Sequence, residues 1–387
     1  MKINRKIWNQ LTITTIIRTV YSTGFRMIFP YQPIFMKELG MSLSQMTRLI
    51  AGQSAVGILS PLLASVADAR GRKTGMLIGM LVFCLGTLVV AIQPTVLGFF
   101  LFLIFSLVGK AIFDPSIQAY FGDKIPYQRR GFVLAISEVS WSMSFFLGVP
   151  AAGFLLNQFG LLAPFLVLAV LGILSFLVVI IIIPPDIAPE PHRRSLGSNI
   201  GQVIRPGPAL AGLGVTLFIC FANQIINVVF GVWLNESYGL QIAALGGASA
   251  VIGISELIGE GGVGLVSDRL SKQKAVLYGT IGNILASAAL PFLGGTVWGA
   301  YLGLFFFYLT FEFTIVSIIP LMTGVLPEAR ATVMALNIAS ASLGRGLGSI
   351  IAAPLYTMGF GLSAAMAAIV NLLAIFSLRY VVVIEEG

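Results

Sequence analysis

Stretches of about 20 apolar residues recur along the whole chain, which is the length a helix needs to cross the roughly 30 Å hydrocarbon core of a bilayer. Short polar or charged connections separate them. Only 10% of the residues are charged and 57% are apolar, whereas about a quarter of a soluble domain is charged. The pattern indicates an all-α integral membrane protein without room for a sizeable soluble domain.

Apolar runs bounded by turn and charge signals predict twelve transmembrane helices. The predicted spans are residues 10–36, 46–66, 75–93, 97–121, 131–156, 161–183, 207–234, 242–266, 275–294, 297–322, 331–355 and 361–383.

Lys and Arg residues gather in the connections on one side of this arrangement. With both termini in the cytoplasm, seventeen of these basic residues fall on the cytoplasmic side, and two, Lys37 and Arg48, fall outside. Such an excess predicts the orientation in the membrane. It also accounts for the net charge of +8, so we expect no nucleic acid as a partner.

The longest polar connection, PPDIAPEPHRRSLGSNIGQVIRP, predicts a cytoplasmic linker. We expect a six-helix bundle at residues 1–184, the linker at 185–206 and a second six-helix bundle at 207–387. Three segment pairs recur in the same order at an offset of roughly 200 residues: ASVADARGRK with GLVSDRLSKQK, FMKELG with WLNESYG, and IPYQRRG with LPEARAT. This repeat predicts pseudo-symmetric halves with a solute site near the bilayer midplane at the repeat interface.

The segment ASVADARGRKTGM resembles the loop 2–3 signature of the major facilitator superfamily, with Asp68, Gly71, Arg72 and Lys73 in register. Two positions depart from the signature, because Ala64 stands for its first glycine and Ala69 for a basic residue. The second copy keeps the residues Gly264, Asp268 and Arg269.

Two further segments are similar to those of drug–proton antiporters in this superfamily. They are FPYQPIF in the first span and FLGVPAAGF in the fifth, where Val149 separates Gly148 from Pro150. The resemblance implies the twelve-helix fold and transport, and it does not name a substrate. It also implies a conformational latch, in which Asp68 meets the N-terminal end of the eleventh helix and Arg72 pairs with Asp123.

Ionisable residues at bilayer depth are costly and are functional candidates by default. Glu256 and Glu260 lie one turn apart in the eighth span, and two carboxylates so close cannot both ionise cheaply in a medium of low dielectric constant. We therefore expect this pair to handle a proton or cation. The alternatives are that one glutamate pairs with Arg345 or lies close to the cytoplasmic interface.

Arg345 and four more residues complete the expected proton and substrate cavity. Glu312 shares a helix face with Tyr301 and Tyr308, so it either holds a cation or pairs with Arg345. Arg26 lies near the middle of the first span and should meet an anion, either a carboxylate or a substrate group. Asn223 and Asn227, on one stripe with Thr216 and Cys220, either face the cavity or form hydrogen bonds between helices.

Lys110 and Asp114 lie one turn apart in the fourth span, which favours an intrahelical ion pair. Gln118 continues their stripe by one more turn. Arg18 could compete for Asp114 or bind Glu138, and a switchable contact between Arg18 and Asp114 would form a gate.

The leading functional hypothesis is secondary active transport by alternating access, with proton-coupled export of a small amphipathic or cationic solute. One alternative keeps the fold but binds an anionic or zwitterionic substrate, such as an organic acid or a lipid, at Arg26 and Arg345. Another is a non-transporting membrane sensor or scaffold.

An enzyme is not expected, because the sequence contains no GxxxxGK[ST] segment and no His, Cys and Asp cluster with metal-binding spacing. We expect no cofactor or metal, with the proton as the coupling ion. We also expect a monomer in the cell membrane, in contact with lipid.

The latch predicts that Asp68→Asn leaves folding intact and slows transport. The charge that is removed interacts with a helix terminus, and this contact stabilises one conformation of the transporter by about 0.3–1 kcal/mol. That is enough to shift an equilibrium between two conformations that differ in free energy by a few kcal/mol. Solute flux in liposomes measures the effect. Unchanged flux would contradict the latch.

Overall fold

A computed structural model describes residues 5–63, 71–125, 127–185, 203, 207–266, 270–326 and 330–382. These residues form helices joined by short turns, and no strand occurs among them. Ten helical segments within these described ranges are long and apolar enough to cross a membrane. Each of the twelve predicted spans contains at least one described helix, so the all-α, twelve-helix prediction agrees with the structure.

The chain forms two compact units. Unit 1 comprises Met1–Met41, Leu59–Pro191 and Gln241–Gly253, and unit 2 comprises Ser42–Ile58, His192–Leu240 and Ile254–Gly387. Each unit therefore includes one helical stretch from the other half of the sequence. The division at 1–184, 185–206 and 207–387 stays a prediction, because the units follow packing rather than chain order.

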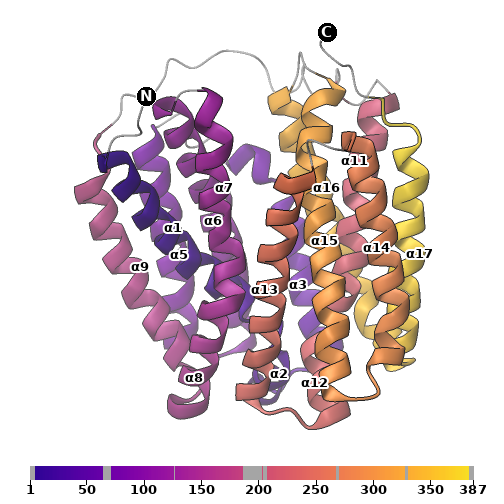
Figure 1. Ribbon diagram of the computed structural model, residues 1–387. Helices are drawn as coiled ribbons and strands as arrows, with labels where there is room; N and C mark the ends of the chain where they lie inside the picture. Colours follow the sequence, from indigo (N-terminus) through magenta and orange to yellow (C-terminus); the bar gives the residue numbers. More distant parts are fainter. Residues whose placement is uncertain are drawn as a thin grey trace. The chain divides into compact units, whose positions relative to one another are not determined.

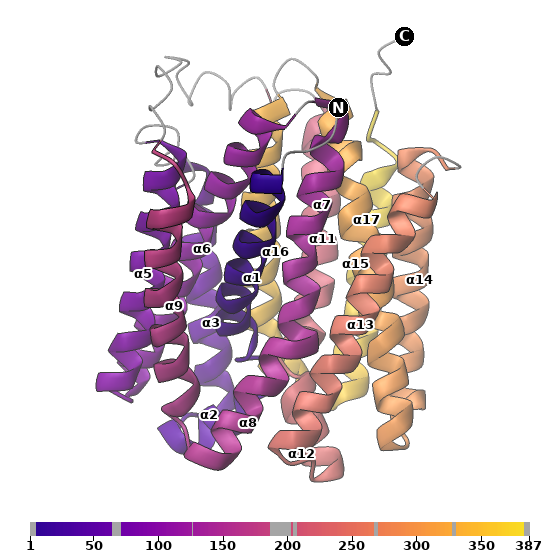
Figure 2. The same cartoon turned by 60° about the vertical axis from the view of Figure 1, so that its left-hand side comes forward.

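In unit 1, α1, α5, α6 and α9 run alongside one another (Figures 1 and 2). The helices of this unit are α1 (Arg5–Arg26), α2 (Gln32–Leu39), α5 (Arg72–Ile92), α6 (Val96–Lys124), α7 (Tyr127–Met143), the π-helical turn η1 (Ser144–Gly148), α8 (Val149–Phe159), α9 (Ala163–Ile182) and the first half of α13 (Ile242–Val266).

In unit 2, α11 packs against α16 and α17, α14 packs against α15 and α17, and α3 packs against α16. The helices of this unit are α3 (Leu43–Gly57), α11 (Gly207–Asn227), α12 (Phe230–Tyr238), the second half of α13, α14 (Lys272–Leu293), α15 (Val297–Val325), α16 (Arg330–Thr357) and α17 (Phe360–Leu378).

Three spans predicted as continuous are broken. The first divides into α1 and α2 around Met27–Tyr31, next to Pro30 and Pro33. The fifth passes through η1 directly before Pro150, which has no N–H to donate to the preceding turn. The seventh divides between Asn227 and Phe230, at the position in the repeat where the first is broken, although no proline lies there.

The internal repeat is visible in matching local geometry. Gly40 ends α2 and Gly239 ends α12, and both have a φ of 64°, a left-handed conformation that glycine adopts without steric penalty. Thr95 caps α6 by accepting from the Gly98 N–H at 3.2 Å, and Thr296 caps α15 in the same way. Both α6 and α15 have 29 residues.

One long-range contact also repeats. The Lys73 ammonium at the start of α5 donates to the carbonyl oxygen of Ile180 in α9 at 2.7 Å. The Gln273 side-chain amide at the start of α14 donates to the carbonyl oxygen of Val381, just beyond α17. The equivalent helices of the two units are therefore tied at the same end, which confirms the pseudo-symmetry inferred from sequence.

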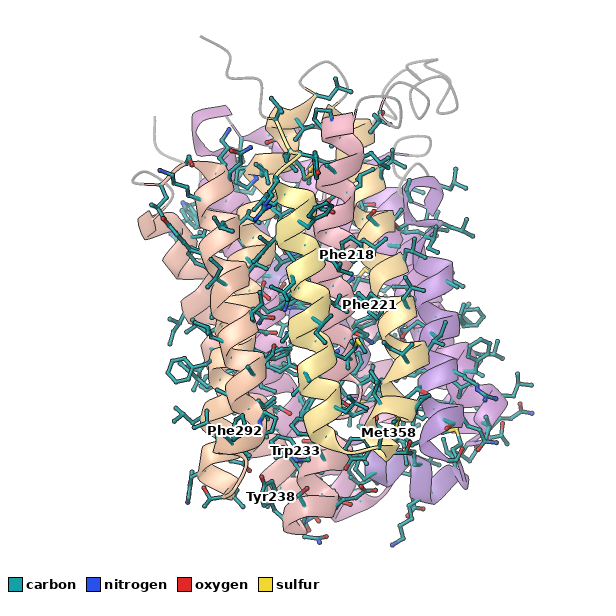
Figure 3. All side chains as sticks on the ribbon, turned by 90° about the vertical axis from the view of Figure 1, so that its right-hand side faces the viewer. Phe218, Phe221, Trp233, Tyr238, Phe292 and Met358 are labelled. Carbon is teal, nitrogen blue, oxygen red and sulfur yellow. The ribbon has the colours of Figure 1, made fainter. Side chains whose placement is uncertain are left out.

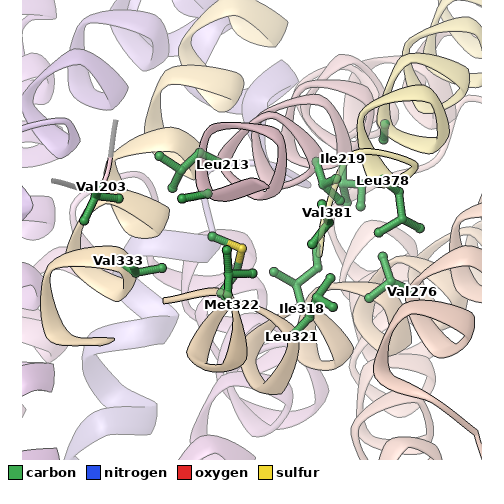
Figure 4. Packing of buried hydrophobic residues seen from close by; sticks show 14 of the residues in the cluster. Val203, Leu213, Ile219, Val276, Ile318, Leu321, Met322, Val333, Leu378 and Val381 are labelled. Carbon is green, nitrogen blue, oxygen red and sulfur yellow. The ribbon is translucent and has the colours of Figure 1, made fainter. Parts of the chain in front are cut away.

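The apolar core of unit 2 lies between α11, α14, α15, α16 and α17 (Figure 4). Met322 of α15 reaches α11 at Gly212, where an added Cβ would lie 2.5 Å from the methionine sulfur. A small residue on α11 thus allows the long side chain of Met322 to fill the space between the two helices.

Aromatic residues anchor α12 at one end of unit 2, where Figure 3 labels Trp233 and Tyr238. The Trp233 ring stacks on Phe360 of α17, with centroids 3.8 Å apart and planes 4° apart. The Tyr238 hydroxyl donates to the carbonyl oxygen of Gly294, beyond the end of α14. Phe292 in the same region is 87% exposed, as expected for a side chain that faces lipid.

Glycines bring the backbones of α11 and α16 close together. A Cβ added at Gly344 would lie 2.2 Å from the Leu217 carbonyl oxygen, and one at Gly348 would lie 2.8 Å from that of Phe221. Spacing of four residues between such glycines is typical of close helix pairs in membranes.

Gly344→Ala should therefore lower the thermal unfolding temperature of the purified protein, because overpacking costs about 1–3 kcal/mol. The matched control is Gly346→Ala in the same turn, where the nearest atom to the added Cβ, Cβ of Ser54, is 3.6 Å away. The control should leave stability unchanged or slightly raised. Equal destabilisation by both changes would contradict the close packing at Gly344.

Candidate functional site

Unit 1 contains a buried network of four charged side chains centred on Arg18 of α1. The Arg18 guanidinium lies 3.0 Å from Asp114 of α6 (Nε to Oδ1) and 2.7 Å from Glu138 of α7 (Nη1 to Oε1). It also donates to the Ser137 carbonyl oxygen at 3.0 Å. The sequence left open which carboxylate binds Arg18, and the structure shows that both do.

Lys110 completes this network. Its ammonium lies 2.6 Å from Asp114 Oδ2, which confirms the intrahelical pair expected from the spacing. Gln118, one turn farther along α6, donates to Glu138 at 3.1 Å. Two cations thus balance two anions, as burial of charge requires. The side chain of Asp114 is 15% exposed and has two cationic partners. The side chain of Glu138 is 42% exposed and has one cationic partner.

Arg26 lies at the C-terminal end of α1, where the chain breaks before α2. Its guanidinium is 4.1 Å from the ring centre of Trp141 and 3.5 Å from that of Phe145, and it donates to the Trp141 carbonyl oxygen at 2.8 Å. The Lys110 ammonium also lies over Trp141, at 5.2 Å. Sequence reasoning missed Trp141 and Phe145, because an aromatic residue in an apolar helix gives no signal of a cation partner.

In unit 2, a seam of polar contacts joins α11 to α16. The Thr216 hydroxyl donates to Asn337 at 2.5 Å, and the Gln224 amide donates to the Ser349 hydroxyl at 3.0 Å. Gln224, Asn337 and Ser349 were not among the predicted site residues. Their polarity inside apolar spans was the signal that could have found them.

The seam continues to α15 through Asn227. The Tyr308 hydroxyl donates to Asn227 Oδ1 at 2.7 Å, and the Asn227 amide donates to Gln224 at 3.2 Å. Glu312 lies one turn beyond Tyr308 on α15 and is buried. Asn227 therefore contributes to bonding between helices, one of the two roles that the sequence allowed.

The remaining predicted cavity residues are distributed over three helices of unit 2. Glu256 on α13 is 1% exposed, and Glu260, one turn later, is half-buried. Both make further contacts within the structure. Asn223 on α11 is buried and Arg345 on α16 is half-buried.

The loop residues of the family signature lie at one end of unit 1. Arg72 at the start of α5 lies 3.2 Å from the Asp123 carboxylate (Nε to Oδ2), so the predicted contact is present. Gly71, directly before α5, has a φ of 92°. Asp68, Asp268 and Arg269 lie outside the described residues, and the latch remains a prediction.

Among the described residues, no group of three or more His, Cys, Asp or Glu side chains could hold a metal ion.

A family model described as Major Facilitator Superfamily matches residues 14–349. An uncharacterized MFS-type transporter, YceJ of Bacillus subtilis (strain 168), is 26% identical over 374 residues, covering 95% of this chain and 94% of that protein. The multidrug resistance protein MdtG of Klebsiella pneumoniae (strain 342) is 23% identical over 299 residues, covering 74% of this chain and 72% of that protein.

Solved structures share the fold at low sequence identity. A D-xylose–proton symporter aligns with a TM-score of 0.77 and 17% identity, covering 97% of this chain and 98% of that one.

Asp114→Asn should destabilise the protein strongly, because Arg18 and Lys110 would lose the carboxylate that they share. Breaking a buried ion pair costs about 3–5 kcal/mol, and thermal unfolding in detergent measures the loss. Asp123→Asn, which removes the exposed partner of Arg72, should cost about 0–1 kcal/mol. Similar decreases of the unfolding temperature in the two variants would contradict the importance of the Asp114 ion pairs for stability.

Proposed function

This chain belongs to the Major Facilitator Superfamily and is a multi-pass membrane transporter rather than an enzyme. We propose that it exports a small amphipathic or cationic solute in exchange for protons. The transport cycle proposed is alternating access, in which the solute site opens in turn to each side of the membrane. The resemblance first seen in the loop of Asp68 to Lys73 is thereby confirmed at the level of the family.

The observation that carries the proton-coupling proposal is the burial of two carboxylates one turn apart in α13. Glu256 is almost fully buried and Glu260 half-buried, within a segment apolar enough to cross a membrane. Adding a proton to this pair relieves repulsion between like charges, so its protonation state can respond to the gradient.

The unit 1 network offers a gate in which the contacts of Arg18 with its carboxylates switch during the transport cycle. The Glu138 carboxylate accepts hydrogen bonds from two side chains, Arg18 and Gln118. Loss of the contact between Arg18 and Glu138 would leave Arg18 bound to Asp114 and to the Ser137 carbonyl oxygen, and would weaken the contact of α1 with α7. The greater exposure of Glu138 makes it the accessible carboxylate of the network.

Export of amphipathic solutes is supported by relatives named as multidrug resistance proteins. Carboxylates at Glu256, Glu260 and Glu312 suit a cationic group on such a solute. The excess of basic residues on one side supports a plasma-membrane protein with both termini in the cytoplasm. We further propose that it works as a monomer in contact with lipid and without a cofactor or nucleic acid.

Reconstitution in liposomes with an imposed pH gradient tests proton coupling. Flux of a cationic amphipath such as ethidium should follow the gradient in the wild type, and Glu256→Gln or Glu260→Gln should abolish that dependence. Arg72→Gln serves as the control, because it alters the loop contact and leaves the buried carboxylates in place. Its flux should be no faster than that of the wild type, and it should still respond to the gradient.

Flux that ignores the gradient in the wild type, or that keeps its full gradient dependence in both glutamine variants, would overturn this proposal.

A further inference from the structure

Arg345 is a cation in a membrane-spanning helix. It lies within the segment Thr332–Thr357 and is half-buried. Its guanidinium makes no hydrogen bond or ion pair with any residue that the structure describes, whereas its carbonyl oxygen accepts from the Ser349 hydroxyl at 2.9 Å. The other arginines within described helices of this depth, Arg18 and Arg26, both have such partners.

Asn223 on α11 is a second unsatisfied donor. The residue is 6% exposed, and its side-chain Nδ2 is buried without an acceptor among the described residues. Leaving a buried donor unpaired is unfavourable, and native structures contain few such groups.

The two donors belong to the same region of unit 2. The contacts of Thr216 with Asn337 and of Gln224 with Ser349 bracket them, because Asn223 precedes Gln224 and Arg345 lies one turn before Ser349. The Cys220 thiol, one turn from Asn223, is close enough to Arg345 and Glu312 to interact electrostatically with both. Helices α11, α15 and α16 thus converge on one polar position.

Both groups can only donate hydrogen bonds, and the positive charge of Arg345 favours an acceptor that carries negative charge. A guanidinium binds carboxylate and phosphate in a two-point geometry, and an amide N–H can add a third bond. We propose that Arg345 and Asn223 form a subsite for the anionic group, carboxylate or phosphate, of the transported solute. This inference rests on the proposed function and concerns those of its amphipathic solutes that carry an acidic group.

Three probes with one aromatic body test the subsite: 2-naphthoate, 2-naphthyl phosphate and the uncharged 2-naphthamide. Binding is measured by titration calorimetry with the full chain in nanodiscs, without a pH gradient. At least one of the two anions should bind the wild type about 10- to 100-fold more tightly than the amide, from the strength of charge-assisted hydrogen bonds. The preferred anion distinguishes a carboxylate solute from a phosphate solute.

Arg345→Gln should remove the preference for the anion and leave binding of the amide unchanged. Asn223→Leu should weaken the preference for the anion. Arg379→Gln removes the same charge from an exposed position beyond α17 and should bind as the wild type does. Thermal unfolding without probe checks folding, and Arg345→Gln should not lower it, since no ionic partner is lost. A lower unfolding temperature of Arg345→Gln would instead indicate a structural role for Arg345.

Equal affinity of the wild type for the anions and the amide, no binding of any probe, or unchanged anion preference in Arg345→Gln would each overturn the subsite. Because no gradient is present, loss of proton-driven flux with intact anion binding would contradict only the proposed function.

Discussion

The pairing of charge inside an apolar environment is the constraint on which the rest of this structure depends. A charged side chain in the hydrocarbon region must find an opposite charge, an aromatic face or a polar backbone group. In unit 1, Arg18 meets this need by joining α1, α6 and α7 through Asp114 and Glu138. The same interactions that make burial tolerable therefore also fix how these helices pack.

The two units share a backbone plan and differ in how they treat charge. Matching caps at Thr95 and Thr296 and matching helix breaks after Arg26 and Asn227 show the common plan. At the break, unit 1 places a guanidinium between aromatic rings, whereas unit 2 places an amide within a hydrogen-bonded seam. The repeat thus keeps one backbone plan while the side chains at the break differ.

Much of this could be predicted from the sequence. Hydropathy placed the helices because each must bury about 20 apolar residues, and the spacing of Lys110 and Asp114 predicted their pair. Pro30 and Pro33 were a sequence signal for the break at Met27, whereas no residue marks the break at Val228 or shows the rings around Arg26. The sequence also could not decide between Asp114 and Glu138 for Arg18, because contacts over about 100 residues require the fold.

We propose that buried ionisable groups link solute binding to proton exchange. Titration calorimetry of one binding probe in two buffers with different ionisation enthalpies measures the protons released or taken up on binding. The account predicts that a measurable fraction of a proton is exchanged per bound molecule near neutral pH, and that this exchange falls in Glu256→Gln or Glu260→Gln. Identical binding enthalpies in both buffers for the wild type would contradict it.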